Sequence, residues 1–203
     1  VSNSLFARNR SLANQGDAIY IRGLDPGNRV VLQHNTFANP TMEDGAAIYV
    51  EDDTVAITNT LIASHTIAIE RVDGAVSEDY SLFADVTTPF SGTVKIGTHS
   101  ITGTAAFYNT TAYTLTANSA ALDAGVNAGI TSDYFGDPRP QRGGFDIGYD
   151  EAPFTAAVHL CFTSLDGTTT YASSADSQAV RNAVAAAASG STVHVAGNCA
   201  GVA

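Results

Sequence analysis

The sequence predicts an all-β fold, specifically a right-handed parallel β-helix (solenoid) in which short strands wind into stacked coils. Three observations predict it. Similar apolar segments recur along the first half of the chain, each alternates apolar and polar residues with a period of two, and no helical pattern lies between them. A repeat of roughly 20 to 30 residues with variable loops is the signature of a solenoid. A β-sandwich whose strands are similar by chance is the alternative.

The first series of repeats is an aromatic or aliphatic residue followed by alanine. Its four copies are centred on Phe6, Phe37, Ile62 and Phe83. If each repeat forms one coil, these side chains stack inside the solenoid at about the 4.8 Å separation of neighbouring strands. Polar residues precede them, among them Asn3, His34 and Asn59. We expect these polar residues at the bends between strands, where side chains hydrogen-bond to turn backbone.

A second series of β-branched segments follows the first three copies. Its members are Ala18–Ile21, Ala47–Val50 and Thr66–Ile69. Their spacing aligns Ile19 with Ile48 and Ile67. The loops between the two series shorten along the chain, and the longest are Asn9–Gly16 and Asn39–Gly45. Because loops on one side of a solenoid usually build its working face, we expect any groove to lie toward the N-terminal coils.

Three ordered blocks follow between residues 119 and 151. They read Ser-Ala-Ala-Leu-Asp-Ala-Gly from Ser119, Asp-Tyr-Phe-Gly-Asp-Pro-Arg-Pro from Asp133, and Gly-Phe-Asp-Ile-Gly-Tyr-Asp-Glu from Gly144. This segment resembles the closing segment of bacterial secreted right-handed parallel β-helix proteins of the pectate-lyase-like superfamily, many of which are surface proteins. The resemblance implies a β-helix over residues 1–151 and an extracellular or cell-surface location.

The departures from that family pattern are Ala120, where proline is usual, and Tyr149, where alanine is usual. Neither is expected to change the fold. The resemblance implies little about chemistry, because the superfamily includes lyases, hydrolases, adhesins and structural proteins.

The closing segment also has a physical role that its residues suggest. Pro138 and Pro140 cannot donate ladder hydrogen bonds, so we expect the segment to stop another strand from adding to the last coil. Arg139 is expected to pair with Asp123 or Asp146.

A calcium site is the functional alternative for the same segment. Its ligands would be Asp133, Asp137 and Asp146, because calcium binds several oxygen ligands. Calcium is the one cofactor that the sequence leaves open.

The composition changes after Glu151. Residues 152–174 are predicted to be a linker that contains a strand at Val158–Phe162 and a turn at Asp166-Gly167. Residues 175–203 are predicted to form a short Ala-rich capping helix followed by a strand. The helix is expected at Ala179–Ala187, after a capping box, and the strand at Thr192–Ala196.

In β-helix proteins of this kind, such a helix and strand commonly open a solenoid. The resemblance therefore implies that a second β-helix unit begins near residue 175. The alternative is a cap that folds back on the first solenoid.

Charge and cysteine content limit the partners and the compartment. A formal net charge of −11 disfavours nucleic acid and anionic lipid as partners. No apolar run reaches the roughly 18 residues needed for a membrane span, and we expect the numbering to begin inside a longer precursor.

Cys161 and Cys199 are the two cysteines. An even pair in a Lys-poor chain is compatible with an exported protein that carries one disulfide, with two free thiols as the alternative.

No strong catalytic motif is present. Glycoside hydrolysis needs two carboxylates about 5 to 10 Å apart. The candidates are Glu51, Asp52 and Asp53, together with Asp73 or Glu78. Carboxylates in polar loops are usually only solvated, so we assign no catalytic residue. Lys95 and Arg71 match no lyase motif.

The sequence therefore favours an extracellular structural or adhesive module of a larger cell-surface, sheath or filament protein. Copies of itself or a tandem β-helix unit are the expected partners. The alternatives are a β-helix polysaccharide lyase or glycoside hydrolase, and a non-catalytic glycan-binding adhesin. Exposed rings at Tyr20 and Tyr49 would favour polysaccharide binding.

Overall fold

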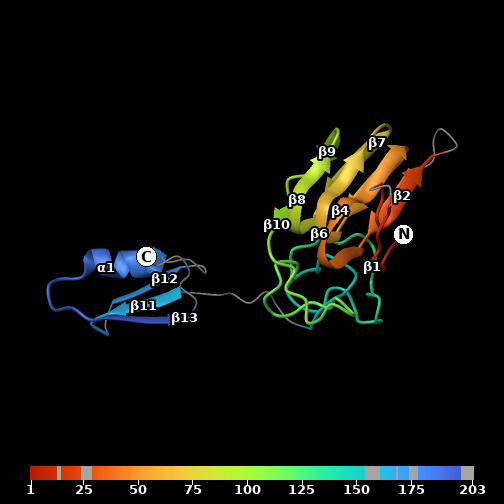
Figure 1. Ribbon diagram of the computed structural model, residues 1–203. Coiled ribbons are helices and arrows are strands. Elements are labelled where there is room, and N and C mark those ends of the chain that lie inside the picture. Colours follow the sequence, from red (N-terminus) through yellow and green to blue (C-terminus); the bar gives the residue numbers. More distant parts are fainter. Residues whose placement is uncertain (13–14, 24–28, 154–160, 168, 174–177, 198–203) are drawn as a thin grey trace. The chain divides into compact units, whose positions relative to one another are not determined.

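The computed structural model describes residues 1–12, 15–23, 29–153, 161–167, 169–173 and 178–197. The chain divides into two compact units, Val1–Ala156 and Ala157–Ala203, which are described separately (Figure 1). Within the described ranges, the helix is too short and too polar to cross a membrane.

The first unit is a parallel β-solenoid of about four turns, which confirms the predicted fold class. Its strands form two parallel sheets (Figure 1). The first sheet contains β1 (Leu5–Ala7), β2 (Ile19–Arg22), β4 (Thr36–Asp52), β6 (Leu61–Arg71), β8 (Leu82–Ser91) and β10 (Ile101–Thr102). The second sheet contains β3 (Arg29–Gln33), β5 (Thr54–Thr58), β7 (Ala75–Asp79) and β9 (Val94–Ile96). Strand order is β1-β4-β6-β8-β10, with β2 also on β4, and β3-β5-β7-β9.

The predicted inner ladder is present. Phe6 pairs with Phe37, Phe37 with Ile62, and Ile62 with Phe83 in successive coils. The rings of Phe6 and Phe37 stack with centroids 4.8 Å apart, close to the separation of neighbouring strands. Phe37 and Ile62 have no exposed surface, so the ladder lies in the solenoid core.

The bends also lie where the polar residues predict them. Asn3, His34, Asn59 and Tyr80 each stand three residues before a ladder position, and each has a positive φ between 46° and 54°. Non-glycine residues rarely adopt this left-handed conformation, and asparagine tolerates it best. The same bend is therefore repeated in four coils.

Two details of the second repeat series differ from the prediction. Ile48 pairs with Ile69, and Ile67 pairs with Ala46, so the third copy is displaced by two residues. A shift of two keeps the apolar residues on the same face, because side chains alternate with period two. The expected loop Asn39–Gly45 belongs to β4, whose pairing with β6 shifts register on both sides of Glu43.

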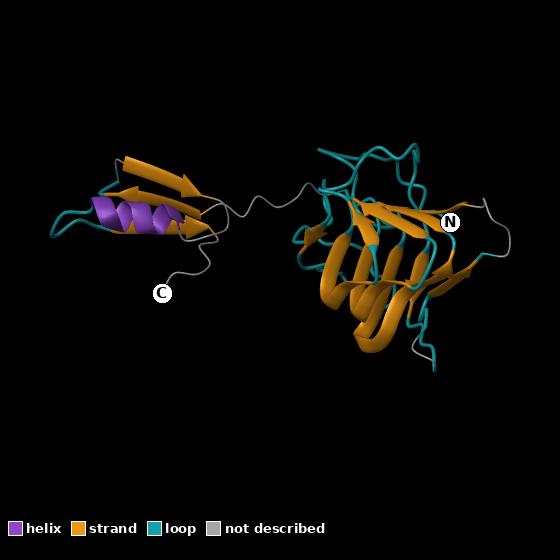
Figure 2. Cartoon of the chain, turned by 90° about the horizontal axis from the view of Figure 1, so that it is seen from above, coloured by secondary structure: helices purple, strands orange, loops and turns teal. Residues whose placement is uncertain are grey.

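Residues 104–152, here called the lateral segment, lie differently from our expectation. They pack along the outer side of several coils, against outward-facing residues of β4, β6 and β8 (Figures 1 and 2). The shared apolar cluster includes Leu61 and Leu82 from the coils and Leu122 and Ile147 from the segment. The physical reason is that these strands are apolar on both faces, and the outer face needs a cover.

The second unit contains a three-stranded antiparallel sheet and one helix. Its strands are β11 (Cys161–Leu165), β12 (Thr169–Ser173) and β13 (Val193–Gly197), in the order β12-β11-β13. The helix α1 (Gln178–Ala186) and β13 match the predicted helix and last strand.

The predicted turn at Asp166-Gly167 joins β11 to β12, and both residues have a positive φ. β12 was not predicted, and it lies in the segment expected to be a linker. Whether this unit opens a second β-helix stays a prediction.

Candidate functional site

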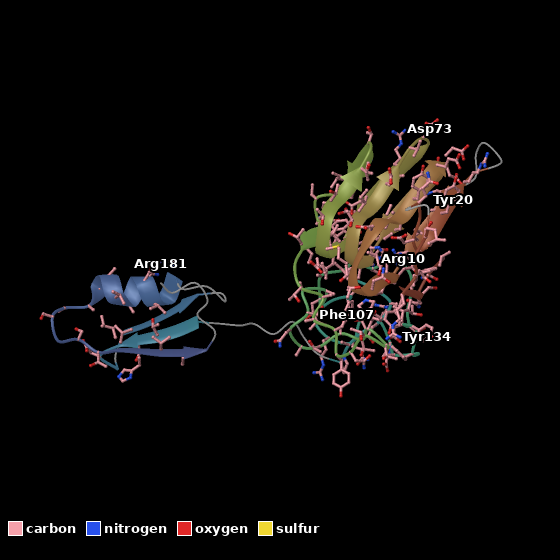
Figure 3. The ribbon with its side chains drawn as sticks, viewed as in Figure 1. Arg10, Tyr20, Asp73, Phe107, Tyr134 and Arg181 are labelled. Carbon is pink, nitrogen blue, oxygen red and sulfur yellow. The ribbon has the colours of Figure 1, made fainter. Side chains whose placement is uncertain are left out.

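Three of the carboxylates considered for glycoside hydrolysis bind turn backbone. Asp52 Oδ1 accepts a hydrogen bond from Gly23 N at 2.7 Å, and Asp73 Oδ1 accepts one from Gly74 N at 2.7 Å. Asp53 Oδ1 accepts from the amide of the next residue. Figure 3 shows Asp73 at the tip of the turn between β6 and β7. These carboxylates stabilise turns in the way that aspartate commonly does.

The two predicted glutamates have other partners. Glu51 accepts a hydrogen bond from the Tyr20 hydroxyl and lies 3.6 Å from Nε of Arg22. Glu78 is buried, and its Oε2 accepts a hydrogen bond from Ser100 Oγ at 2.6 Å. Burial raises the pKa of the Glu78 carboxyl above its usual range. The candidate base Arg71 donates from Nε and Nη2 to the carbonyl of Gly74.

The two tyrosines whose exposure would favour polysaccharide binding stack on each other. The rings of Tyr20 and Tyr49 lie with centroids 5.2 Å apart and an interplanar angle of 11°. Tyr20 is 46% exposed (Figure 3), whereas Tyr49 is only 8% exposed. One ring of this pair is therefore accessible.

Two of the three residues considered for a calcium site, Asp133 and Asp146, bind backbone amides. Asp133 Oδ1 accepts from the amides of Phe135 and Asp137, and its Oδ2 accepts from Glu151 N at 2.8 Å. Both oxygens of Asp146 also accept backbone N–H groups. Among the described residues, no group of three or more His, Cys, Asp or Glu side chains could hold a metal ion.

We expected Arg139 to pair with Asp123 or Asp146, but its ion-pair partner is Glu151. Its Nη1 lies 2.7 Å from Glu151 Oε2, and both side chains are buried. Arg139 also donates to the carbonyl of Gly148 at 2.9 Å. Glu151 takes this role because its carboxylate lies inside the same network, where it also accepts the amide of Asp146. The network links residues 139, 146, 148 and 151 of the lateral segment.

Sequence reasoning missed a buried polar cluster that Asp17, Asn39 and His65 form. Asp17 precedes β2, Asn39 lies in β4 and His65 lies in β6. His65 Nδ1 and Asp17 Oδ2 are 3.8 Å apart, too far for a hydrogen bond, and neither atom has a hydrogen-bond partner among the residues that the structure describes. Burial lowers the pKa of His65 to about 4 and raises the pKa of Asp17. No spacing in the sequence indicates this cluster, because its three members come from different coils.

The lateral segment contains a pocket of about 550 Å³ with aromatic and acidic residues in its wall. The lining residues are Tyr108, Thr114, Leu115, Thr116, Ala117, Phe135, Asp137, Asp150, Ala152 and Pro153. A second pocket, of about 480 Å³, lies between residues 103–113 and the coils and has small residues such as Ala63 and Ala84 in its wall.

The first coil in this sequence pairs with the second coil. Within the part of the chain that the structure describes, β1 and β2 each pair with β4 alone. Phe6 and Ile19 on these strands are only partly buried, although they continue the inner ladders. At the other end of the stack, β9 pairs with β7 and β10 pairs with β8.

Comparison of the chain with family models, curated proteins and solved structures finds no match. Its function is therefore inferred from the geometry of the molecule. Cys199 lies outside the described residues, so its pairing with Cys161, the first residue of β11, stays a prediction.

Proposed function

We propose that the chain is an extracellular structural and adhesive module of a larger cell-surface, sheath or filament protein. The single observation that carries the proposal is the ladder of parallel coils, in which Phe6, Phe37, Ile62 and Phe83 pair from one coil to the next. A stack of this kind is extended by any further coil that continues the ladder, whether that coil belongs to the same chain or to another.

The two ends of the stack differ, so they can meet head to tail. β9 and β10 at the far end also have one neighbour each among the described strands. A contact between unlike ends generates open filaments when the rotation does not close. A tandem β-helix unit of the same protein could continue the same ladder. The extracellular location is supported by the resemblance of the 119–151 segment to surface proteins.

The contacts of the acidic residues give little support to a catalytic role. The carboxylates suggested for glycoside hydrolysis bind turn amides, a tyrosine hydroxyl or a serine hydroxyl. A polysaccharide lyase or hydrolase thus has weaker support than a structural module.

The test is the assembly state of the chain, measured by sedimentation velocity over a range of concentrations and by electron microscopy. We expect end-to-end oligomers. Phe6→Lys places a charge on the inner face of the first coil and should abolish them. Tyr20→Lys is the matched control, since it adds the same charge on the outer face of the same coil. A chain that stays monomeric throughout, or turnover of a polysaccharide that is lost when one acidic residue is changed, would overturn the proposal.

A further inference from the structure

The pocket in the lateral segment is built from three separate stretches of chain. Residues 108–117, 135–137 and 150–153 meet around about 550 Å³, which is within the range of small-molecule sites. The wall is held firmly, because Asp150 Oδ2 accepts a hydrogen bond from Leu115 N at 2.7 Å. This hydrogen bond joins two of the three stretches that form the wall.

Two large aromatic side chains in this wall are open to solvent. Tyr108 is 77% exposed and Phe135 is 51% exposed. Phe135 is fixed from behind, since its ring packs at 5.1 Å from Tyr134 and 5.7 Å from Tyr149 (Figure 3 shows Tyr134). An exposed, immobilised ring beside a pocket offers a π face to a ligand.

Two carboxylates in the same wall form no ion pair with a residue that the structure describes. Among the described residues, neither Asp137 nor Asp150 takes part in an ion pair. Arg139 is engaged by Glu151, and Arg142 donates to the carbonyl of Pro153. Asp150 is buried and Asp137 is exposed. Burial is the main cause that raises the pKa of Asp150 to about 6. Repulsion from Asp133 and Asp137 adds to it, whereas the hydrogen bond from Leu115 and the charge of Arg139 oppose it.

We propose that this pocket binds an organic ammonium ion, that is, a positively charged nitrogen carried on a small apolar body. The aromatic faces of Tyr108 and Phe135 attract a cation through the ring quadrupole. Asp137 and Asp150 supply the opposite charge, and Leu115 and Ala152 contact the apolar body. A neutral saccharide would stack on the same rings but would leave the two carboxylates uncompensated. This site goes beyond the proposed assembly role and does not depend on it.

Titration calorimetry of the full chain tests this inference with choline as the probe. Its neutral isostere 3,3-dimethyl-1-butanol has the same shape without the charge. We expect choline to bind at least tenfold more tightly than the isostere, and we expect its affinity to fall as salt is added. Equal binding of the two, binding of neither, or tighter binding of a neutral oligosaccharide would contradict the inference.

Variants locate the site. Asp137→Asn, Asp150→Asn and Phe135→Leu should each weaken choline binding about tenfold. Asp137 is exposed, so its variant is expected to fold even if Asp150→Asn does not, and the urea midpoint of each variant checks this. Asp73→Asn is the control, because it removes the same charge from a turn outside the pocket. If Asp73→Asn weakens choline binding as much as Asp137→Asn does, the affinity depends on the net charge of the protein. The proposed binding site would then be wrong. The pocket lies within a single chain, so choline binding does not require assembly. Failure of the assembly proposal would therefore leave these results unchanged.

Discussion

Phe37 is the centre of the inner ladder, since its neighbours in the adjacent coils are Phe6 and Ile62 and it has no exposed surface. Phe37→Ala should lower the free energy of unfolding by roughly 3 to 5 kcal/mol, through the lost transfer free energy and the cavity left behind. Phe6→Ala should have a clearly smaller effect, because Phe6 is only partly buried. Urea unfolding followed by circular dichroism measures both. Equal losses would show that the two rings are equally buried in solution.

His65 gives a prediction about pH. Burial lowers its pKa to about 4 in the folded chain, against about 6.5 when unfolded. Between these values the unfolded chain takes up a proton that the folded chain does not. The contribution of His65 to the unfolding free energy is therefore fully present above pH 6.5. This contribution falls by about 1.4 kcal/mol per pH unit as the pH drops toward 4.

His65→Gln removes this dependence. The unfolding free energy of the variant, relative to that of the unchanged protein, should rise as the pH falls from 6.5 to 4. The difference at pH 8, where the ring is neutral in both states, is the internal reference. A difference that is the same at pH 8 and pH 4.5 would show that His65 is not buried as described.

The Arg139–Glu151 ion pair is the third place where a single substitution is expected to change the unfolding free energy. Glu151→Gln leaves a buried guanidinium without its counterion and should cost about 3 to 5 kcal/mol of unfolding free energy. The double variant Arg139→Met, Glu151→Leu should recover part of that loss, because no unpaired charge remains buried. A double variant less stable than Glu151→Gln alone would mean that the other hydrogen bonds of Arg139 matter more than its charge.

At the scale of the elements, the turns between coils depend on glycine for space as well as for conformation. Gly74 and Gly129 share a φ of 79°, but a Cβ on Gly74 would lie 2.2 Å from the carbonyl oxygen of Asp53, whereas Gly129 has nothing within 4 Å. Gly129→Ala should therefore cost only about 1 kcal/mol, the conformational penalty. Gly74→Ala should cost more, because it also pushes neighbouring coils apart. Thermal unfolding of the two variants separates the two effects, and equal melting temperatures would mean that the coils yield at no cost.

The elements also show why the sequence predicts some features and misses others. The ladder through Phe37 and the bends at His34 and Asn59 follow from local patterns that repeat in every coil. The two-residue displacement of Ile67 does not, because a period of two gives either register the same inner face. The lateral packing of residues 104–152 and the Asp17–His65 cluster depend on contacts between distant segments, for which the sequence carries no repeat.

At the scale of the whole molecule, the lateral segment joins coils that otherwise contact only their neighbours. It bonds to the first coil through Asn3, whose Nδ2 donates to the carbonyl of Ser132, and to the third coil through Asn59, whose carbonyl accepts Gly148 N. In a solenoid, stability is otherwise a sum of nearest-neighbour terms. The segment is therefore expected to make the first unit unfold as one cooperative body.

The second unit carries both cysteines of the chain, and this leads to the last prediction. Its buried side chains include Val180 and Ala183 on α1, a small core for a helix on three strands. A bond between Cys161 and Cys199 would close a loop of about 39 residues and add roughly 3 to 4 kcal/mol. Thiol titration of the denatured, unreduced protein should find no free thiol, and reduction should unfold the second unit at a lower urea concentration while the first is unaffected. Two free thiols in protein kept under oxidising conditions would show that the unit is stabilised in another way.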